Sequence, residues 1–336
     1  MNVQELTGAF GLDRVVPATR PTPEPGPGQV RIRMRAASLN YRDLLMVKGQ
    51  YNPRLPLPMI PASDGVGIVE SVGAGVSPTL EGTRVCPTFS QAWLDGPPDA
   101  AALRSTLGGP LDGVLAEQMV VHADATVPVP EHLSDEEAAC LPCAALTAWS
   151  ALAEHGNLKP GDTVLTLGSG GVSLFALAFA QMFGARVIAT SSCGEKLERL
   201  EALGAAKTLN YREDPRWGRT VRKLTGGVDH VVEVGGAGTL EQSLAALRPG
   251  GSVSLIGVLS GGVEKLSLFP ILMNNIRVQG IFVGHRRSFH EMNRAITAHQ
   301  FRPVVDRSFP LSETRAALEY LASGQHMGKV VIRISE

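Results

Sequence analysis

Residues 163–173, TVLTLGSGGVS, decide the fold that we predict for this chain of 336 residues. TVLTLG is an apolar run typical of a buried strand, and the segment after the glycines, VSLFALAFAQMFG, has apolar residues at helical spacing. A glycine-rich turn between a strand and a helix leaves room for a phosphate against the backbone, where the first N–H groups of the helix face it. The stretch therefore predicts the first strand, turn and helix of a dinucleotide-binding domain.

The following segments repeat the order of strand and helix. Short apolar runs (ARVIATS, KTLNY, DHVVEV, GSVSLIGV, IRVQGIF) alternate with helical patterns (GEKLERLEALG, PRWGRTVRKLTG, GTLEQSLAALR). This alternation predicts parallel βαβ units, and nearly continuous apolar strands are typical of a sheet with helices on both faces. We predict an α/β fold with a doubly wound Rossmann domain over residues 126–285, in which IRVQGIF is the last strand.

The two ends of the chain have a different pattern of residues. QVRIRMRAASL alternates like a half-buried strand, and proline clusters exclude long helices nearby, so residues 1–125 predict a β-rich domain. Ser134, with Glu137 three positions later, is a predicted N-cap of one helix through SDEEAACLPCAALTAWSALAEHG. Beyond HRRSF, one helix (SETRAALEYLASG) and a last strand (GKVVIRI) predict a return segment over residues 286–336.

Composition excludes several classes of protein. The net charge is −1 without a block of Lys and Arg, which gives no electrostatic support for a nucleic-acid or membrane-surface partner. No apolar run reaches the roughly 18 residues of a membrane span, and MNVQELTGAF lacks the layout of a signal peptide. Four cysteines are too few for a disulfide scaffold of this length. We expect a soluble, cytoplasmic protein that acts on a small molecule.

The glycine turn also indicates which nucleotide binds. Gly168 and Gly170 match the first two glycines of G-x-G-x-x-G/A, and Ser173 takes the third, small position. NAD-binding versions usually place an acid at the end of the second strand, whereas that strand ends here in Ser191-Ser192. Hydroxyls donate to a 2′-phosphate that a carboxylate would repel. NADPH is therefore preferred over NADH. The nearby residues predicted to complete this site are Ser169, Gly171, Val172, Lys196 and Tyr211.

Taken together, these parts resemble the medium-chain dehydrogenase/reductase superfamily over essentially the whole chain. The resemblance is carried by NYRDLLMVKGQY, PASDGVGIVESVGAGV, LPCAALTAW and VLTLGSGGVSLFALAFA. It implies that residues 1–125 form a GroES-like catalytic domain, which the return segment completes. It also implies a homodimer joined edge to edge through IRVQGIF, whose apolar edge would otherwise be exposed.

The resemblance further implies where zinc would bind in the zinc-type alcohol dehydrogenases of this superfamily. By position, Asn40 replaces the first ligand and Ser63 the second, so only Cys143 falls on a ligand position. An amide, a hydroxyl and one thiol are not the three-ligand set of catalytic zinc, and the stretch for structural zinc has only Cys86. We expect no zinc. Cys140-x-x-Cys143 could be a redox pair, but its apolar surroundings favour burial.

Chemistry without a Lewis acid favours an acceptor that is already electrophilic. The resemblance to metal-free quinone oxidoreductases and enoyl reductases implies hydride transfer from NADPH to a quinone or an α,β-unsaturated carbonyl. The alternatives are an alcohol or aldehyde dehydrogenase of the zinc type and a low-turnover NADPH sensor. By position, Asn40 would orient the nicotinamide ribose or the substrate oxygen, and Tyr51 would donate to the developing oxyanion. Packing beside Pro53 is the alternative for Tyr51, and Asp43 is expected to cap or tie the loop.

The fold places further residues along the predicted cofactor site. Those expected to contact the cofactor are Thr147, Gly235, Gly257, Val258, Phe282, Val283 and Lys329. The segment of residues 90–113 is longer than a compact connection requires. It is either a surface excursion or a lobe whose Trp93 and Leu94 shape an apolar substrate wall.

Overall fold

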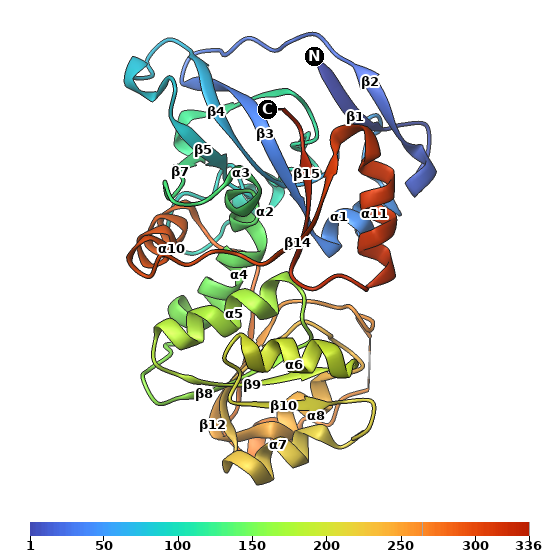
Figure 1. Ribbon diagram of the computed structural model, residues 1–336, viewed down its shortest axis with the longest axis vertical. Coiled ribbons are helices and arrows are strands. Elements are labelled where there is room, and N and C mark those ends of the chain that lie inside the picture. Colours follow the sequence, from blue (N-terminus) through green and yellow to red (C-terminus); the bar gives the residue numbers. More distant parts are fainter. Residues whose placement is uncertain (264, 336) are drawn as a thin grey trace. The chain divides into compact units, whose positions relative to one another are not determined.

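The computed structural model describes residues 1–263 and 265–335, and within these ranges the chain divides into two compact units (Figure 1). The first unit comprises Met1–Leu146 and Gly284–Glu336, and the second comprises Thr147–Val283. The predicted α/β class, a Rossmann sheet together with a β-rich unit, is confirmed. None of the helices in the described ranges combines the length and apolarity needed to cross a membrane.

The second unit is a parallel sheet with helices on both faces (Figure 1). Its strands are, in neighbouring order, β10 (Lys207–Asn210), β9 (Arg186–Ser191), β8 (Thr163–Leu167), β11 (Val228–Glu233), β12 (Leu247–Leu255) and β13 (Arg277–Gly280). Its helices are α5 (Gly171–Met182), α6 (Gly194–Ala202), α7 (Trp217–Thr225), α8 (Leu240–Ala246) and α9 (Phe269–Met273). In Figure 1, α5 and α6 cover one face, while α7 and α8 cover the other. The strand order reverses between β8 and β11, the point at which such sheets bind ligands.

The first unit is built on an antiparallel framework. Its sheet runs β14 (Val305–Pro310), β15 (Lys329–Arg333), β3 (Gln29–Leu39), β4 (Asp64–Val72), β5 (Arg84–Pro87) and β7 (Thr126–Pro128), while β6 (Gln118–His122) also pairs with β3 and β1 (Asn2–Leu6) pairs with β2 (Val15–Thr19). Side chains of β3 alternate as predicted, with Val30, Ile32 and Met34 buried. The return strand β15 pairs with β3, although the two strands lie near opposite ends of the sequence.

The helices of the first unit are α1 (Tyr41–Val47), α2 (Ala100–Arg104), α3 (Asp135–Ala138), α10 (Arg286–Ala298) and α11 (Thr314–Ser323). The predicted tail of one helix and one strand was wrong, because α10 and β14 are also present. Helix α10 buries Phe289, Met292 and Ile296 on one face, at the i, i+3, i+7 spacing of an amphipathic helix.

The boundary predicted after residue 125 was also wrong, since the first unit continues to Leu146. The reason is that α3 packs on β3 and β4, and the Cys86 thiol donates to the carbonyl of Ala138 (3.4 Å). The Ser134 cap is confirmed, because its hydroxyl accepts from the N–H of Glu137 and its own N–H donates to that carboxylate. The single helix predicted after it is instead interrupted. Wide π turns at Leu141–Ala145 and Ser150–Glu154 flank α4 (Leu146–Trp149), the first of them containing a proline that has no N–H to donate.

Candidate functional site

The glycine turn between β8 and α5 is open toward its surroundings. Gly168 has φ +74°, in the left-handed region that favours glycine, and its N–H donates to the carbonyl of Thr190 (2.8 Å). A Cβ built on Gly168 or Gly170 would meet no atom within 4 Å. Because nothing of the described chain fills this space, a pyrophosphate has room to approach the backbone.

The start of α5 supplies the donors for such an anion. Gly170 is the N-cap, and Gly171, Val172 and Ser173 form the first turn, whose N–H groups have no partner within the helix. The Ser173 side chain is buried, and its hydroxyl donates to the carbonyl of Leu167 (2.6 Å). This small residue therefore joins the helix to the end of the strand, as its position in the motif predicts. Ser169, within the turn, is buried as well.

The structure brings the predicted 2′-phosphate residues together at the ends of β9 and β10. The N–H of Tyr211 donates to the carbonyl of Ser191 (3.2 Å), and the Tyr211 side chain is exposed. Ser191 is buried, whereas Ser192 is half-buried just after the strand end. Lys196, also half-buried, lies in the first turn of α6. Thr190, Ser191 and Ser192 carry hydroxyl groups at this edge and no carboxylate.

Two glycines of the predicted cofactor site have a different reason to be glycine. A Cβ on Gly235 would lie 2.2 Å from the hydroxyl oxygen of Thr239, and one on Gly257 would lie 2.4 Å from the carbonyl oxygen of Val234. The chain itself occupies both spaces. Their lack of a side chain thus serves the packing of this unit, and contact with a nucleotide remains a prediction for both.

A buried acid that sequence reasoning missed holds the turn after β11. The Glu233 carboxylate accepts from the N–H groups of Gly235 (2.7 Å) and Gly236 (3.0 Å) and from the hydroxyls of Thr239 and Ser243. An acid that ends an apolar strand, two residues before the first of two glycines, was the available signal. Glu233 shapes the loop that carries Gly235.

The other predicted contacts of the second unit lie at its beginning and its carboxyl-edge loops. Thr147 is buried in α4, and Val258 is half-exposed after β12. Phe282 is partly buried, while Val283 is buried with φ +55°. A β-branched residue rarely adopts this left-handed conformation, so the surrounding structure must hold it there. Their roles toward a nucleotide stay predictions.

In the first unit, polar side chains from distant segments form one buried chain of hydrogen bonds. The Lys329 ammonium donates to the carbonyl of Leu39 (2.7 Å) and to the side-chain oxygen of Asn40 (2.5 Å). The Asn40 amide nitrogen lies 3.4 Å from the Ser63 hydroxyl, which donates to Asp64 (2.7 Å). Lys329 is 3% exposed, and Ser63 and Asp64 are fully buried. We name these four residues, Lys329, Asn40, Ser63 and Asp64, the buried polar chain.

Burial and nearby charges explain why the pKa values of Asp64 and Cys143, at the buried polar chain, are shifted. Burial raises the pKa of Asp64, against which the Lys329 charge and hydrogen bonds from Asn40, Ser63 and the N–H of Cys143 (3.0 Å) act. Burial likewise raises the pKa of the Cys143 thiol far above its ordinary value, and the Asp64 charge adds to this effect. The thiol therefore stays protonated at neutral pH.

Asp43 ties the start of α1, as predicted. Its carboxylate accepts from the backbone N–H of Asn40 (2.8 Å), which closes the first turn of the helix. Burial raises the pKa of Asp43 to about 6, although the neighbouring Arg42 charge opposes the rise. This bond fixes the backbone that carries the Asn40 side chain.

Arg42 was not predicted, yet it organises the neighbourhood of Tyr51. Its guanidinium lies 5.2 Å from the centroid of the Tyr51 ring and 4.9 Å from that of Phe89. It also donates to the carbonyl of Gly109 (2.5 Å) and the hydroxyl of Thr106 (3.1 Å). Tyr51 is 49% exposed, which fits both the packing role and the role of a hydrogen-bond donor, so its catalytic role stays a prediction.

The segment of residues 90–113 is anchored on its own unit. The Trp93 ring is 7% exposed and contacts the His285 ring edge to face, with centroids 5.8 Å apart. Its indole N–H donates to the carbonyl of Gly96 (2.8 Å). The Trp93 ring thus packs against the start of α10, and its predicted role in an apolar substrate wall stays a prediction. Leu94 is 41% exposed.

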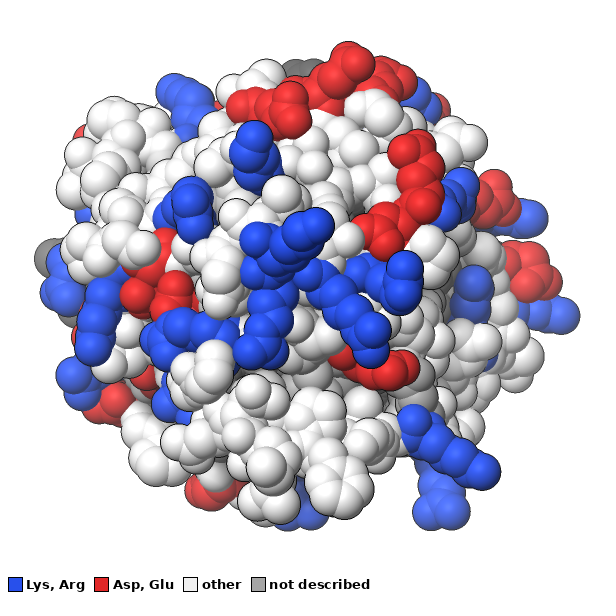
Figure 2. Space-filling model, turned by 90° about the horizontal axis from the view of Figure 1, so that it is seen from below, with Lys and Arg blue, Asp and Glu red and all other residues white. Residues whose placement is uncertain are grey.

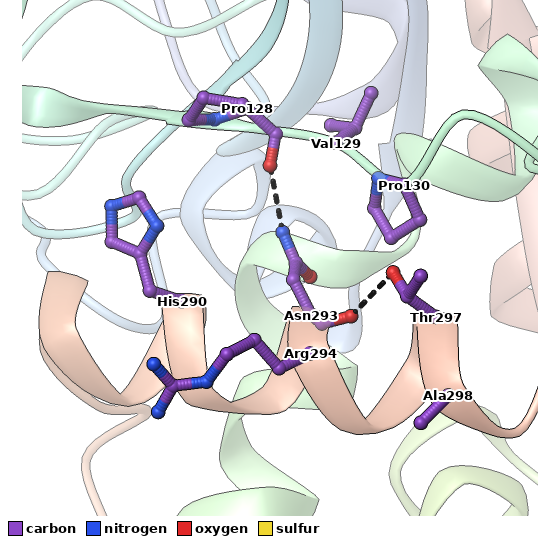
Figure 3. Close-up of a pocket in the computed structure, with 8 residues that line it drawn as sticks. All are labelled: Pro128, Val129, Pro130, His290, Asn293, Arg294, Thr297 and Ala298. Atoms are coloured by element: carbon purple, nitrogen blue, oxygen red, sulfur yellow. Dashed lines mark hydrogen bonds between the residues drawn. The ribbon is translucent and has the colours of Figure 1, made fainter.

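A shallow groove lies between α10 and the chain after β7 (Figure 3). It encloses about 390 Å³. The amide of Asn293 crosses it to donate to the carbonyl of Pro128 (2.9 Å). The lining residues are Pro128, Val129, Pro130, His290, Asn293, Arg294, Thr297 and Ala298, and none of them is a predicted site residue.

Charges of both signs are present on the face of the molecule drawn in Figure 2. Figure 2 shows Lys and Arg side chains gathered across the middle of the face seen from below, with Asp and Glu side chains bordering them. This mixture matches the balanced composition of the chain.

Comparison with known proteins identifies the family. The alcohol dehydrogenase GroES-like domain matches residues 26–131, and the zinc-binding dehydrogenase domain matches residues 171–298. A zinc-type alcohol dehydrogenase-like protein of Schizosaccharomyces pombe is 46% identical over 308 residues, which cover 89% of each chain. The chain belongs to the medium-chain dehydrogenase/reductase superfamily. The predicted family and GroES-like fold are confirmed, and the protein is an alcohol dehydrogenase-like oxidoreductase.

Solved structures agree along the whole chain. A structure described as an NAD-dependent alcohol dehydrogenase has a TM-score of 0.91 and 33% identity, covering 100% of both chains. A mycobacterial protein solved in complex with NADPH has a TM-score of 0.83 and 29% identity, covering 99% of this chain and 100% of its own. These neighbours include proteins described with either nucleotide.

The zinc implied by the family does not fit the residues present. Of the three ligand positions, Asn40 offers an amide already bonded to an ammonium and Ser63 a hydroxyl bonded to Asp64, so only Cys143 carries a group that zinc commonly binds. Catalytic zinc requires deprotonated sulfur, neutral imidazole or carboxylate ligands, and the Lys329 cation would repel it. Within residues 1–263 and 265–335, no group of three His, Cys, Asp or Glu is placed to hold a metal.

The open glycine turn generates a test. We expect Gly170→Val to weaken NADPH binding at least about tenfold, because the added side chain occupies the space of the pyrophosphate. The midpoint of unfolding should stay nearly unchanged, since a Cβ there meets no atom within 4 Å and Gly170 has φ −77°. Fluorescence titration with NADPH and thermal unfolding measure the two effects. Unchanged affinity in the folded variant would contradict the assignment.

Proposed function

We propose that this oxidoreductase transfers hydride from NADPH to a quinone or an α,β-unsaturated carbonyl compound, without zinc. The observation that supports this most is the buried polar chain, in which Asn40 and Ser63 replace two metal ligands of the zinc-type members and the Lys329 ammonium is bonded to Asn40. Such a site suits an acceptor that needs its oxygen hydrogen-bonded and does not need a Lewis acid.

The reaction asks little of the protein beyond positioning and charge stabilisation. NADPH, when bound, supplies the hydride. As a C–H bond forms at the β-carbon of an enone, the pair of the C=C bond shifts to join the α-carbon and the carbonyl carbon, and the carbonyl π pair moves to the oxygen; a proton then adds at the α-carbon as the carbonyl forms again. An N–H of Asn40 stabilises the negative oxygen, and the half-exposed phenol of Tyr51 donates a second hydrogen bond or the proton.

The preference for NADPH rests on the edge formed by β9 and β10. Ser192 and Tyr211 present polar groups there, and Lys196 adds a positive charge. A 2′-phosphate is favoured by this set, whereas a carboxylate at the end of β9 would favour the 2′-hydroxyl of NADH. The relative solved with NADPH supports this choice, while the NAD-dependent relative represents the competing one.

The decisive assay measures NADPH oxidation by purified enzyme with EDTA present, against one quinone, one enone and one simple aldehyde. We expect acceptor-dependent oxidation with the quinone or the enone at a rate that EDTA leaves within about twofold, because no step uses a metal. The aldehyde serves as the control acceptor. Reduction of the aldehyde alone, abolished by EDTA and restored by zinc, would establish the alcohol dehydrogenase. Tight NADPH binding without turnover would establish the sensor.

Nucleotide preference has its own test at Ser192. We expect Ser192→Asp to lower kcat/KM for NADPH by about tenfold or more relative to NADH, because the new carboxylate repels the 2′-phosphate. Ser192→Asn, neutral and of similar size, is the matched control and should change the ratio little. An unchanged ratio in the Asp variant would remove the 2′-phosphate from this edge.

We further propose that the enzyme works as a cytoplasmic homodimer joined through the edge of the second unit. Strand β13 is the terminal strand of its sheet and leaves Val278 40% exposed. Helix α9, which leads into it, exposes Phe269, Leu272 and Met273, each more than 70%. An unpaired strand edge beside an exposed apolar helix is a surface that a second copy would cover.

The dimer is tested by changing that surface. We expect Phe269→Glu combined with Leu272→Glu to convert the protein to a monomer in sedimentation velocity, because burying two carboxylates in an apolar interface is costly. Leu94→Glu, an exposed apolar position of the first unit, is the control and should leave the dimer intact. A monomeric wild-type enzyme at micromolar concentration would contradict the proposal directly.

A further inference from the structure

Lys329 was expected to contact the cofactor, but its ammonium lies inside the first unit. We propose instead that Lys329 is a positioning residue: it holds the carboxamide of Asn40 so that this side chain presents an N–H group, and not its oxygen, to the substrate. The inference rests on the proposed function, in which Asn40 faces the acceptor oxygen.

The Lys329 ammonium is held inside the first unit by two hydrogen bonds. Lys329 begins β15, and its Nζ reaches the carbonyl oxygen of Leu39 at 2.7 Å and the Asn40 Oδ1 at 2.5 Å. Both side chains are buried, with Lys329 at 3% and Asn40 at 8% exposed. A buried lysine with two short bonds is part of the fixed interior of this unit, and not a mobile arm that closes on a ligand.

Elementary hydrogen-bond chemistry carries the second step. An ammonium has only donors, so the atom of the carboxamide that faces it must be the oxygen, whichever way the amide is drawn. The amide nitrogen then points the other way and lies 3.4 Å from the Ser63 hydroxyl oxygen. That hydroxyl gives its own proton to Asp64 and can only accept from Asn40. Each link thus has one possible direction, from the cation at Lys329 to the carboxylate at Asp64.

The fixed donor and acceptor directions in the buried polar chain determine which kind of group Asn40 can bind. One N–H of the Asn40 amide faces Ser63 and Asp64, which both accept from Asn40, and we assign the other N–H to the substrate. The neighbouring ammonium draws electron density from the amide and strengthens that donor. The group that Asn40 binds must be a hydrogen-bond acceptor, as a carbonyl or quinone oxygen is, and the bond gains strength as negative charge develops there.

Lysine labelling of the wild-type enzyme tests the placement without any variant. The protein is reductively methylated with and without saturating NADPH, and each lysine is read by mass spectrometry. We expect Lys329 to stay unmodified in both samples, while the exposed lysines Lys48, Lys159 and Lys207 are methylated as internal controls. Methylation of Lys329 in the free enzyme, with protection only by NADPH, would assign it to the cofactor and overturn the proposal.

A double-mutant cycle tests the action through Asn40. We expect Lys329→Met to lower kcat for the preferred acceptor by roughly 100-fold, the loss typical of one oxyanion donor, with KM for NADPH within about twofold. In an Asn40→Ala background, Lys329→Met should lower kcat by less than about a further twofold, because the side chain that Lys329 positions is absent. Lys207→Met is the matched control. Losses that multiply in the double variant would show that Lys329 acts independently of Asn40.

The two proposals fail in different ways. If the wild-type enzyme does not oxidise NADPH in the presence of either the quinone or the enone, the proposed function is wrong. The labelling experiment still reports where Lys329 lies. If the wild-type enzyme turns over as proposed but the losses of kcat from Lys329→Met and Asn40→Ala multiply in the double variant, only the positioning role is wrong. If Lys329→Met does not fold, Lys329→Arg replaces it in the cycle. Arg keeps the charge and the donors, so we expect it to retain at least about a tenth of the wild-type kcat.

Discussion

The first unit depends on burying the Lys329 ammonium and the Asp64 carboxylate together. Each charge alone would be costly in a site from which water is excluded, and removing one partner of such a buried set typically costs about 3–5 kcal/mol. The cost is offset because Asn40 and Ser63 link the two charges by hydrogen bonds and the N–H of Cys143 adds another. One network therefore joins the end of β3, the start of β4, the turn after α3 and the return strand β15.

The same network decides what chemistry this unit suits. Its positive charge is an ammonium, its acid is committed to internal donors, and its thiol is held protonated by burial. These groups do not form a ligand set for zinc, and in our proposal they orient the Asn40 carboxamide so that it donates an N–H to the substrate. In the proposed function, an electrophilic acceptor whose oxygen gains charge during hydride transfer accepts from this donor, whereas oxidation of an unactivated alcohol would need a Lewis acid or a base to help remove its proton.

The second unit shows why a glycine pattern needs a structure to be interpreted. Gly168 and Gly170 face open space, so the backbone there is available to a phosphate. Gly235 and Gly257 lie at the same carboxyl edge of the sheet, but the hydroxyl of Thr239 and the carbonyl of Val234 would collide with any side chain on them. The first pair leaves room for a ligand, and the second pair lets the chain pack against itself.

The sequence by itself determined the family, the two fold types, the order of strands and helices in the Rossmann unit, the cap at Ser134 and the glycine turn. The family and the GroES-like fold came from a resemblance that extends over the whole chain, while the other features rest on neighbouring residues, because helical and strand periodicity and turn chemistry are local. Only the tertiary structure brought Lys329 to Asn40, Arg42 to Tyr51 and Trp93 to His285, and extended the first unit to Leu146. These contacts depend on sheet register and on packing between segments far apart in the chain, which no local pattern records.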